Sequence, residues 1–236
     1  MRTEKIYELL MEYVKTLPEE DRAVINHAVE RHGYGVWSEP GTTLGQAIVG
    51  LKEKIAEESA RGAGNTSVLR AMKRIIGESQ NCNYAGAWIG KNGRQYVCSG
   101  YHGVAVDHHF DLPKVDGNES VEKTMRAEPD NTWIDLPMPS VATLRTHIKL
   151  SKAEWIADGK PDRFRAVWDF GEGRPYVNAQ YLLDVLECLP DAVAYVKPGM
   201  FYPVFFHNKN GIGVLLPIRP PVDSKREVTA HRYKAK

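Results

Sequence analysis

Residues 177–219, which read VNAQYLLDVLECLPDAVAYVKPGMFYPVFFHNKNGIGVLLPIR, contain the pattern that decides the fold. Apolar side chains at positions 181, 182, 185, 186 and 189 share one face of a helix, which Asn178 is suited to cap and Pro190 to end. Strands are predicted over 192–196 and 201–206, followed by a hairpin turn at 208–211. The last predicted strand, 212–218, is almost wholly apolar, as expected for a strand covered on both faces. The stretch therefore predicts a compact α+β unit.

The same order of elements occurs once earlier in the chain. Residues 67–77 place apolar side chains at helical spacing, and strands are predicted over 86–89, 94–98 and 101–106. An Asn92-Gly93 turn joins the first two of these strands. This imperfect internal duplication predicts one domain made of two related halves.

The remaining segments surround these two units. Residues 1–62 predict three short amphipathic helices, and glycines at 62 and 64 mark a linker to a domain over 65–220. Residues 112–165 look like an exposed insertion, because their first part is polar and interrupted by prolines; a strand is expected over 144–150 and a short helix after it. Residues 221–236 are basic and poor in apolar side chains, which is typical of a flexible tail.

Residues 178–219 resemble the end of a domain of the bacterial DNA polymerase III β sliding clamp. In that family a helix of the type N-x-x-Y-L-L-D-x-L-x-x-L precedes strands that end in V-x-M-P-[MVI]-R. The matching positions are Asn178, Tyr181, Leu182, Leu183, Asp184, Leu186, Leu189, Pro217 and Arg219. The resemblance implies one clamp-like domain of two helix-plus-strands repeats. Ordinary clamps carry three such domains per subunit, so a ring of this chain would be a homo-oligomer.

The resemblance implies two binding sites. In clamps the helices line a channel and contact DNA phosphates. The resemblance therefore implies that Arg70, Lys73 and Arg74, on one predicted helical turn, bind duplex DNA. The alternative is an ordinary solvated face, and the acidic Asp184 and Glu187 of the second helix favour it.

Clamps also hold short hydrophobic peptides of polymerases and repair proteins in a groove partly formed by the V-x-M-P segment. By that match, part of a peptide groove would be formed by Val214, Leu216, Pro217 and Ile218. The alternative is that these side chains belong to the core. Residues 220–236 follow the motif and would be able to cover the groove.

Catalytic chemistry finds little support in the sequence. Asp107, His108, His109 and Asp111 suggest a metal site, but a strand would direct 107 and 109 to one face and 108 to the other, and no second ligand cluster follows. A polar strand end explains these residues, and a hydrolase that uses them is the third hypothesis for the protein. We expect no cofactor, no resident metal and no catalytic residue.

Composition agrees with a cytoplasmic protein that is not in a membrane. Hydrophobic residues make up 42% and charged residues 26% of the chain, as in soluble globular proteins. No apolar run approaches bilayer length, the N-terminus lacks a signal-peptide core, and the odd number of cysteines suits a reducing compartment. A net charge of +1 neither favours nor excludes a nucleic-acid partner.

The sequence thus predicts a non-catalytic, clamp-like protein associated with DNA replication, of phage or mobile-element type. It would act on DNA by topology or as a scaffold. The alternative is a protein-interaction module that reuses a clamp domain without binding DNA.

Overall fold

The computed structural model describes residues 3–30, 40–79, 85–157, 159, 165–171 and 173–219. These residues form an α+β structure with seven helices, an antiparallel sheet of seven strands and a separate two-stranded sheet. In chain order the elements are α1 (Thr3–Thr16), α2 (Glu19–Glu30), α3 (Pro40–Gly62), α4 (Thr66–Gly77), β1 (Ala87–Ile89), β2 (Gln95–Cys98), β3 (His102–Val106), α5 (Glu119–Met125), β4 (Ile134–Leu136), α6 (Val141–Ala157), β5 (Val167–Asp169), β6 (Tyr176–Asn178), α7 (Ala179–Cys188), β7 (Val193–Val196), β8 (Val204–Asn208) and β9 (Gly211–Leu215).

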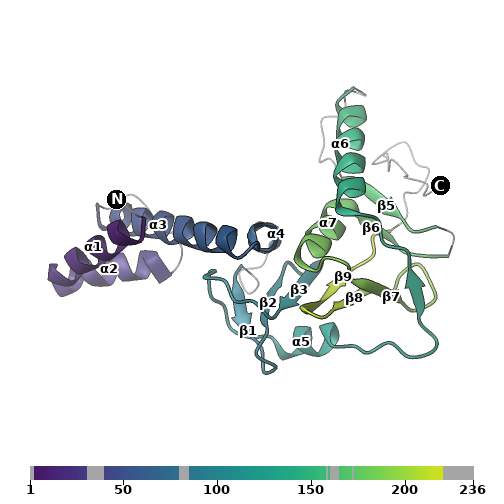
Figure 1. Ribbon diagram of the computed structural model, residues 1–236, viewed down its shortest axis with the longest axis horizontal. Coiled ribbons are helices and arrows are strands. Elements are labelled where there is room, and N and C mark those ends of the chain that lie inside the picture. Colours follow the sequence, from purple (N-terminus) through teal and green to yellow (C-terminus); the bar gives the residue numbers. More distant parts are fainter. Residues whose placement is uncertain are drawn as a thin grey trace.

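The large sheet joins the two predicted units into one structure. Its strand order is β1-β2-β3-β9-β8-β7-β4, so the three strands that follow α4 meet the three that follow α7 in reversed order (Figure 1). The last strands of the two units, β3 and β9, pair antiparallel at the centre, from His102 opposite Leu215 to Val106 opposite Gly211. The predicted succession of a helix and three strands is therefore confirmed for both units.

Helices α4 and α7 pack against each other and cover one face of this sheet. Asn178 caps α7 as predicted, because its side chain accepts a hydrogen bond from the Gln180 amide at 2.9 Å. The core on this face is continuous and apolar; its fully buried members include Leu69, Met72, Ile75, Leu182, Leu189, Phe206 and Leu215. Burial of this face accounts for the apolar helix stripes seen in the sequence.

Glycines in β9 allow α7 to approach the sheet closely. A Cβ built on Gly211 would lie 2.3 Å from the Ala105 carbonyl oxygen and 2.9 Å from Leu189 Cδ2. We expect Gly211→Ala to lower the free energy of unfolding by about 1–3 kcal/mol, because backbone must move to admit the methyl group. Urea denaturation measures the change.

Gly50 in α3 provides the matched control for this prediction. A Cβ there meets nothing within 4 Å, so Gly50→Ala is expected to raise the free energy of unfolding by about 0.5–1 kcal/mol through helix propensity. A Gly211→Ala protein as stable as the unmodified chain would contradict the close contact of Gly211 with the β3 backbone and Leu189.

The opposite face of the sheet carries a second, smaller core. Helix α5 covers part of it, and the buried residues are Trp88, Tyr96, Cys98, Ala105, Met125, Ile212 and Val214. All five residues of β9 are buried, which confirms a strand covered on both faces over 212–215; the predicted strand was too long, since 216–218 lie beyond β9. Figure 1 shows α5 below the sheet and α7 above it.

The described residues between 112 and 157, predicted to be part of an exposed insertion, contribute helices and a sheet strand to the structure. They supply α5, the terminal sheet strand β4, and α6, which packs beside α7. The strand expected over 144–150 is wrong, since these residues lie within α6. Leu144, His147, Ser151 and Trp155 are buried at helical spacing, and this longer period prevails over the local alternation.

The N-terminal helices form a separate small bundle, at the left of Figure 1. Its buried centre consists of Val14, Ile25 and Ile48, so the helices predicted for residues 1–62 are confirmed. The predicted tail over 221–236 lies outside the described residues. None of the described helices combines the length and apolar character needed to cross a membrane.

Candidate functional site

The three basic residues assigned to DNA lie on α4 but have different surroundings. Arg74 reaches α7, where its Nε donates to Asp184 Oδ1 at 2.7 Å and its Nη2 donates to Glu187. Lys73 Nζ lies 3.5 Å from Glu57 and 3.7 Å from Glu53, both on α3. Arg70 is exposed to solvent. One helical turn therefore does not form a cluster of unpaired cations.

The two acidic residues of α7 are buried and paired. Asp184 also accepts from Gln180 Nε2 at 3.0 Å, and Glu187 accepts from Arg145 of α6 at 2.6 Å. Burial lowers the pKa of Arg74, but attraction to Asp184 and hydrogen bonds from Arg74 to Asp184 and Glu187 outweigh burial and raise it above its ordinary value. Arg74 therefore stays charged and compensates carboxylates that would be costly to bury alone.

Helix α6 closes the side of α7 that α4 leaves open. Leu144 of α6 is completely buried in the main core, and His147 contacts the Val167 carbonyl at 2.9 Å through Nε2. All residues of α7 except Gln180 and Tyr181 are buried. Figure 1 shows α6 rising beside α7 from the body of the protein. Little of the surface of α7 is therefore exposed to solvent.

A serine, a histidine and an aspartate meet beneath Tyr181, a contact that the sequence did not suggest. Ser99 Oγ lies 2.8 Å from His102 Nδ1, and His102 Nε2 lies 3.5 Å from Asp184 Oδ2. Tyr181 stacks on the His102 ring at 4.1 Å.

These three residue types are those of a hydrolytic triad, but their setting is structural. All three side chains are almost completely buried, and Ser99 Oγ also accepts from the amides of Tyr101 and His102 at 3.3 Å each. The hydroxyl thus caps the β2–β3 turn and has no access to a substrate. The cluster connects the first unit of the domain to α7 of the second.

The four residues assigned to a peptide groove do not form one surface. Val214 is buried in the second core, beneath α5. Leu216 lies beyond the end of β9; its amide donates to the Tyr101 carbonyl at 2.8 Å, and the Ile218 amide donates to the Tyr176 carbonyl at 2.7 Å. Leu216 is exposed, whereas Pro217 and Ile218 are half-buried. Only 216–218 therefore contribute to the surface.

The residues that suggested a metal site point to separate partners. Asp107 accepts from Arg94 Nε at 2.8 Å, His109 Nε2 contacts the Gly93 carbonyl at 2.7 Å, and Asp111 lies 3.9 Å from Lys52 Nζ. His108 packs edge-on against Phe110. Across the described part of the chain, no three His, Cys, Asp or Glu side chains are grouped to hold a metal ion.

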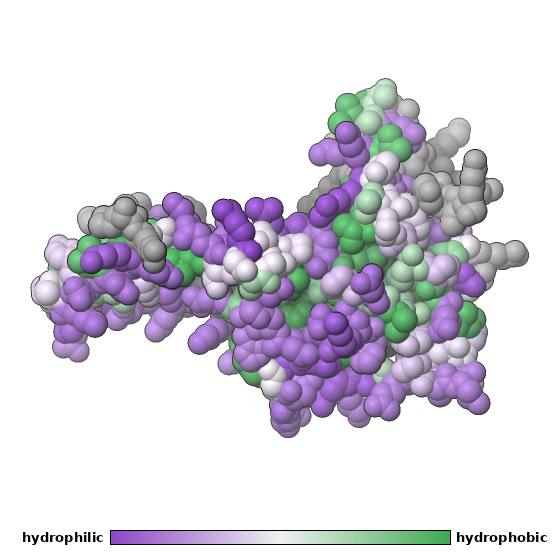
Figure 2. Space-filling view, in the orientation of Figure 1, coloured by the Kyte–Doolittle hydropathy of each residue, from purple (hydrophilic) through white to green (hydrophobic). Residues whose placement is uncertain are grey.

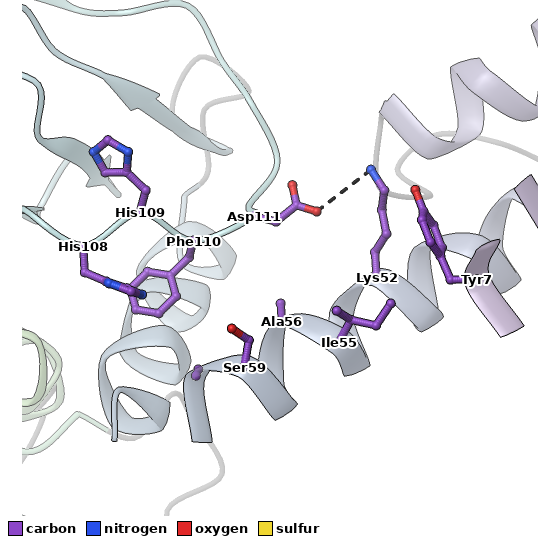
Figure 3. Close-up of a pocket in the computed structure, with 10 residues that line it drawn as sticks. Tyr7, Lys52, Ile55, Ala56, Ser59, His108, His109, Phe110 and Asp111 are labelled. Carbon is purple, nitrogen blue, oxygen red and sulfur yellow. Dashed lines mark ion pairs between the residues drawn. The ribbon is translucent and has the colours of Figure 1, made fainter. Parts of the chain in front are cut away.

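A cavity of about 300 Å³ lies where the N-terminal bundle meets the loop after β3. Figure 3 shows Asp111 and Lys52 turned toward each other across the cavity. Phe110 and His108 lie on the side opposite Lys52, and the ring of His109 points away from α3. The remaining labelled side chains come from α1 and α3: Tyr7, Ile55, Ala56 and Ser59. The lining combines one ion pair with apolar groups, which is the composition of a seam between two packed parts.

Comparison with known proteins yields no relative: no family model, no curated protein and no solved structure matches the chain. What the protein binds is inferred from the surfaces described above.

Proposed function

We propose that this chain is a non-catalytic protein-interaction module of the cytoplasm, built on a sliding-clamp-like domain whose helix face does not hold DNA. The clamp-like assignment is supported by the motif over 178–219 and by the two helix-plus-three-strand units that meet at β3 and β9. The free, buried Cys98 and Cys188 agree with a reducing compartment.

The observation that carries this proposal is the closed and neutralised helix face. Lys73, Arg74 and Arg145 each have a carboxylate within ion-pair distance, and α6 covers α7. Sequence-independent DNA binding depends on cations that displace counterions from phosphates. Cations already paired with carboxylates contribute little to that exchange, so this face offers poor attraction to a polyanion.

Several apolar side chains remain on the surface and suit a protein partner. They include Tyr101 and Leu216 at one end of the β3–β9 pair, Leu150 and Ile156 on α6, and Met200, Phe201 and Tyr202 between β7 and β8. Figure 2 shows hydrophobic surface over the free end of α6 and near the β7 end of the sheet. Exposed apolar clusters of this kind mark protein-binding surfaces.

A DNA-associated clamp is the second candidate, and one observation favours it. Arg70 is exposed, and the side chains of Arg74 and Arg145 remain 40% and 60% exposed despite their ion pairs.

The edges of the sheet argue against a ring of this chain, because a ring closed by strand pairing would need two free sheet edges. The outer edge of β1 is occupied, because the Ala87 amide donates to the Pro113 carbonyl at 2.6 Å.

Titration of a fluorescent DNA duplex with the full chain separates the two candidates. We expect no salt-dependent rise in anisotropy at about 50 mM salt, because the cations of the helix face are paired. Light scattering with circular DNA is the companion measurement.

The opposite results would support the clamp. Binding at low salt that weakens steeply by about 200 mM, and that Arg70→Glu reduces, would show a phosphate-binding face. A closed oligomer that stays on circular DNA and leaves after linearisation would establish a sliding role.

A further inference from the structure

The two edges of the large sheet differ. At β1, residues 113–115 run alongside the outer edge, with a parallel bridge between Ala87 and Lys114. At the other end β4 pairs with β7 on one side, and no backbone hydrogen bond among the described residues engages its other side. Ile134 is 37% exposed, and Asp135 is also exposed. An uncovered edge strand is a template for an added strand.

Apolar side chains gather at the end of the sheet where β4 begins. Ile134 pairs with Val196, the last residue of β7, and the loop that follows carries the exposed Met200, Phe201 and Tyr202. Phe201 is 66% exposed, the highest value among the large hydrophobic residues that the structure describes. Exposed apolar side chains are therefore present on β4 itself and in the loop after its neighbour β7.

Among the described residues, three exposed carboxylates lie on β4 and just before it in the chain. Glu128, Asp130 and Asp135 are all exposed, and hydrogen bonds from Thr132 lower the pKa of Asp130, which keeps it ionised. A cation is also present: Lys197 Nζ lies 5.5 Å from the centre of the Trp133 ring. An incoming strand with positive charge would be attracted.

The alternation of β4 defines what such a strand should present. Asp135 lies opposite Tyr195 and faces one side of the sheet, whereas Ile134 and Leu136 face the other. A partner strand thus meets a carboxylate on one face and, on the opposite face, the exposed Ile134 and the edge of the core at the buried Leu136. The complementary pattern is apolar, basic, apolar.

A second copy of this chain fits the edge poorly. Antiparallel pairing of two β4 strands over all three residues places Asp135 opposite Asp135 of the other copy. Like charges directly across a strand pair destabilise it. The charge at the edge therefore favours a different protein as the occupant.

We propose that β4 accepts an extended segment of a protein partner as an eighth strand, with a basic residue opposite Asp135 and apolar residues beside Ile134 and Leu136. This inference rests on the proposed function and adds where the partner binds and what its segment looks like. The added strand would satisfy the free backbone groups of β4, and the charge would set its register.

A charge exchange at position 135 tests the site. The probes are two fluorescein-labelled synthetic peptides that differ only in their centre, Val-Lys-Val or Val-Glu-Val, titrated with the full chain. We expect the lysine peptide to bind about fivefold more tightly, and Asp135→Lys to reverse the preference. Asp116→Lys, the same charge change at an exposed residue beyond the β1 edge, should keep the original preference.

Amide chemical shifts of labelled protein locate the peptide. Shifts concentrated in β4 and β7 support the proposal. Four results would each overturn the proposal. The shifts could centre on Tyr101 and Leu216, or Asp135→Lys could leave the peptide preference unchanged. The protein could instead dimerise through β4, or neither peptide could bind. The titration with duplex DNA in the same buffer distinguishes failure of the β4 site from failure of the proposed function. Binding of DNA would refute the proposed function. Absence of both DNA binding and peptide binding would refute only the β4 site.

Discussion

Arg74→Ala is expected to lower the free energy of unfolding by about 2–3 kcal/mol, because it leaves the buried Asp184 carboxylate without its cation; solvent at the 40% exposed Arg74 side chain keeps the loss below that of a fully buried ion pair. The guanidinium is the hydrogen-bonded cation that joins Asp184 to Glu187. Asp184 is completely buried, and without Arg74 its remaining side-chain hydrogen bond is the one from Gln180. Urea denaturation followed by circular dichroism measures the change.

Arg70→Ala, one turn earlier on the same helix, is the matched control. Arg70 is exposed, so its replacement should change the free energy of unfolding by less than about 0.5 kcal/mol. Adding Asp184→Asn to Arg74→Ala should recover part of the loss, because a neutral amide is less costly to bury than an unpaired carboxylate, whereas Glu187 keeps its ion pair with Arg145. Equal effects of the two arginine variants would show that Arg74 is not a structural residue.

This contrast between Arg70 and Arg74 explains why the predicted DNA site could not be resolved from the sequence. Both arginines carry the same charge on the same helical face, and the spacing of charges in a helix does not reveal their partners. The partners of Arg74 lie on α7, more than a hundred residues further along the chain. Only the packing of the two units determines which cation is free.

The fold was predictable where the local signal was strong. The helix over 179–188, its cap at Asn178 and the hairpin before Gly211 follow from apolar spacing, capping chemistry and turn residues. The duplication of these elements also predicted that the two halves form one domain. The pairing of β3 with β9 was not predicted; the structure shows it, and all residues of both strands are buried.

The segment over 112–165 was not predictable in the same way. Residues 144–150 alternate between apolar and polar side chains, and a window of that length fits a strand as well as part of a helix. Nor does the sequence show that β4 joins the edge of the sheet, since three residues carry almost no periodic signal. The edge at β4, which defines the proposed partner site, therefore required the structure.

Alkaline pH should destabilise the protein through Cys188. Burial raises the pKa of this thiol well above its ordinary value, and the nearby Asp184 carboxylate raises it further. Above about pH 8.5, where an unfolded thiol ionises, the native state binds more protons than the unfolded state. Below that pH the free energy of unfolding does not depend on the Cys188 thiol. Above it the free energy of unfolding falls as the pH rises, with a slope that approaches about 1.4 kcal/mol per pH unit.

Urea denaturation at a series of pH values from about 7.5 to 10, around the ordinary thiol pKa, measures this slope. Cys188→Ala removes the titrating group, so the variant should lose less stability than the unmodified chain as the pH rises, even though the lost sulfur lowers its stability at neutral pH. Burial also raises the pKa of Cys98, which leaves a smaller slope in the variant. Identical slopes for both proteins would mean that Cys188 is not buried between α4 and α7, and the close packing of the two units would then be wrong.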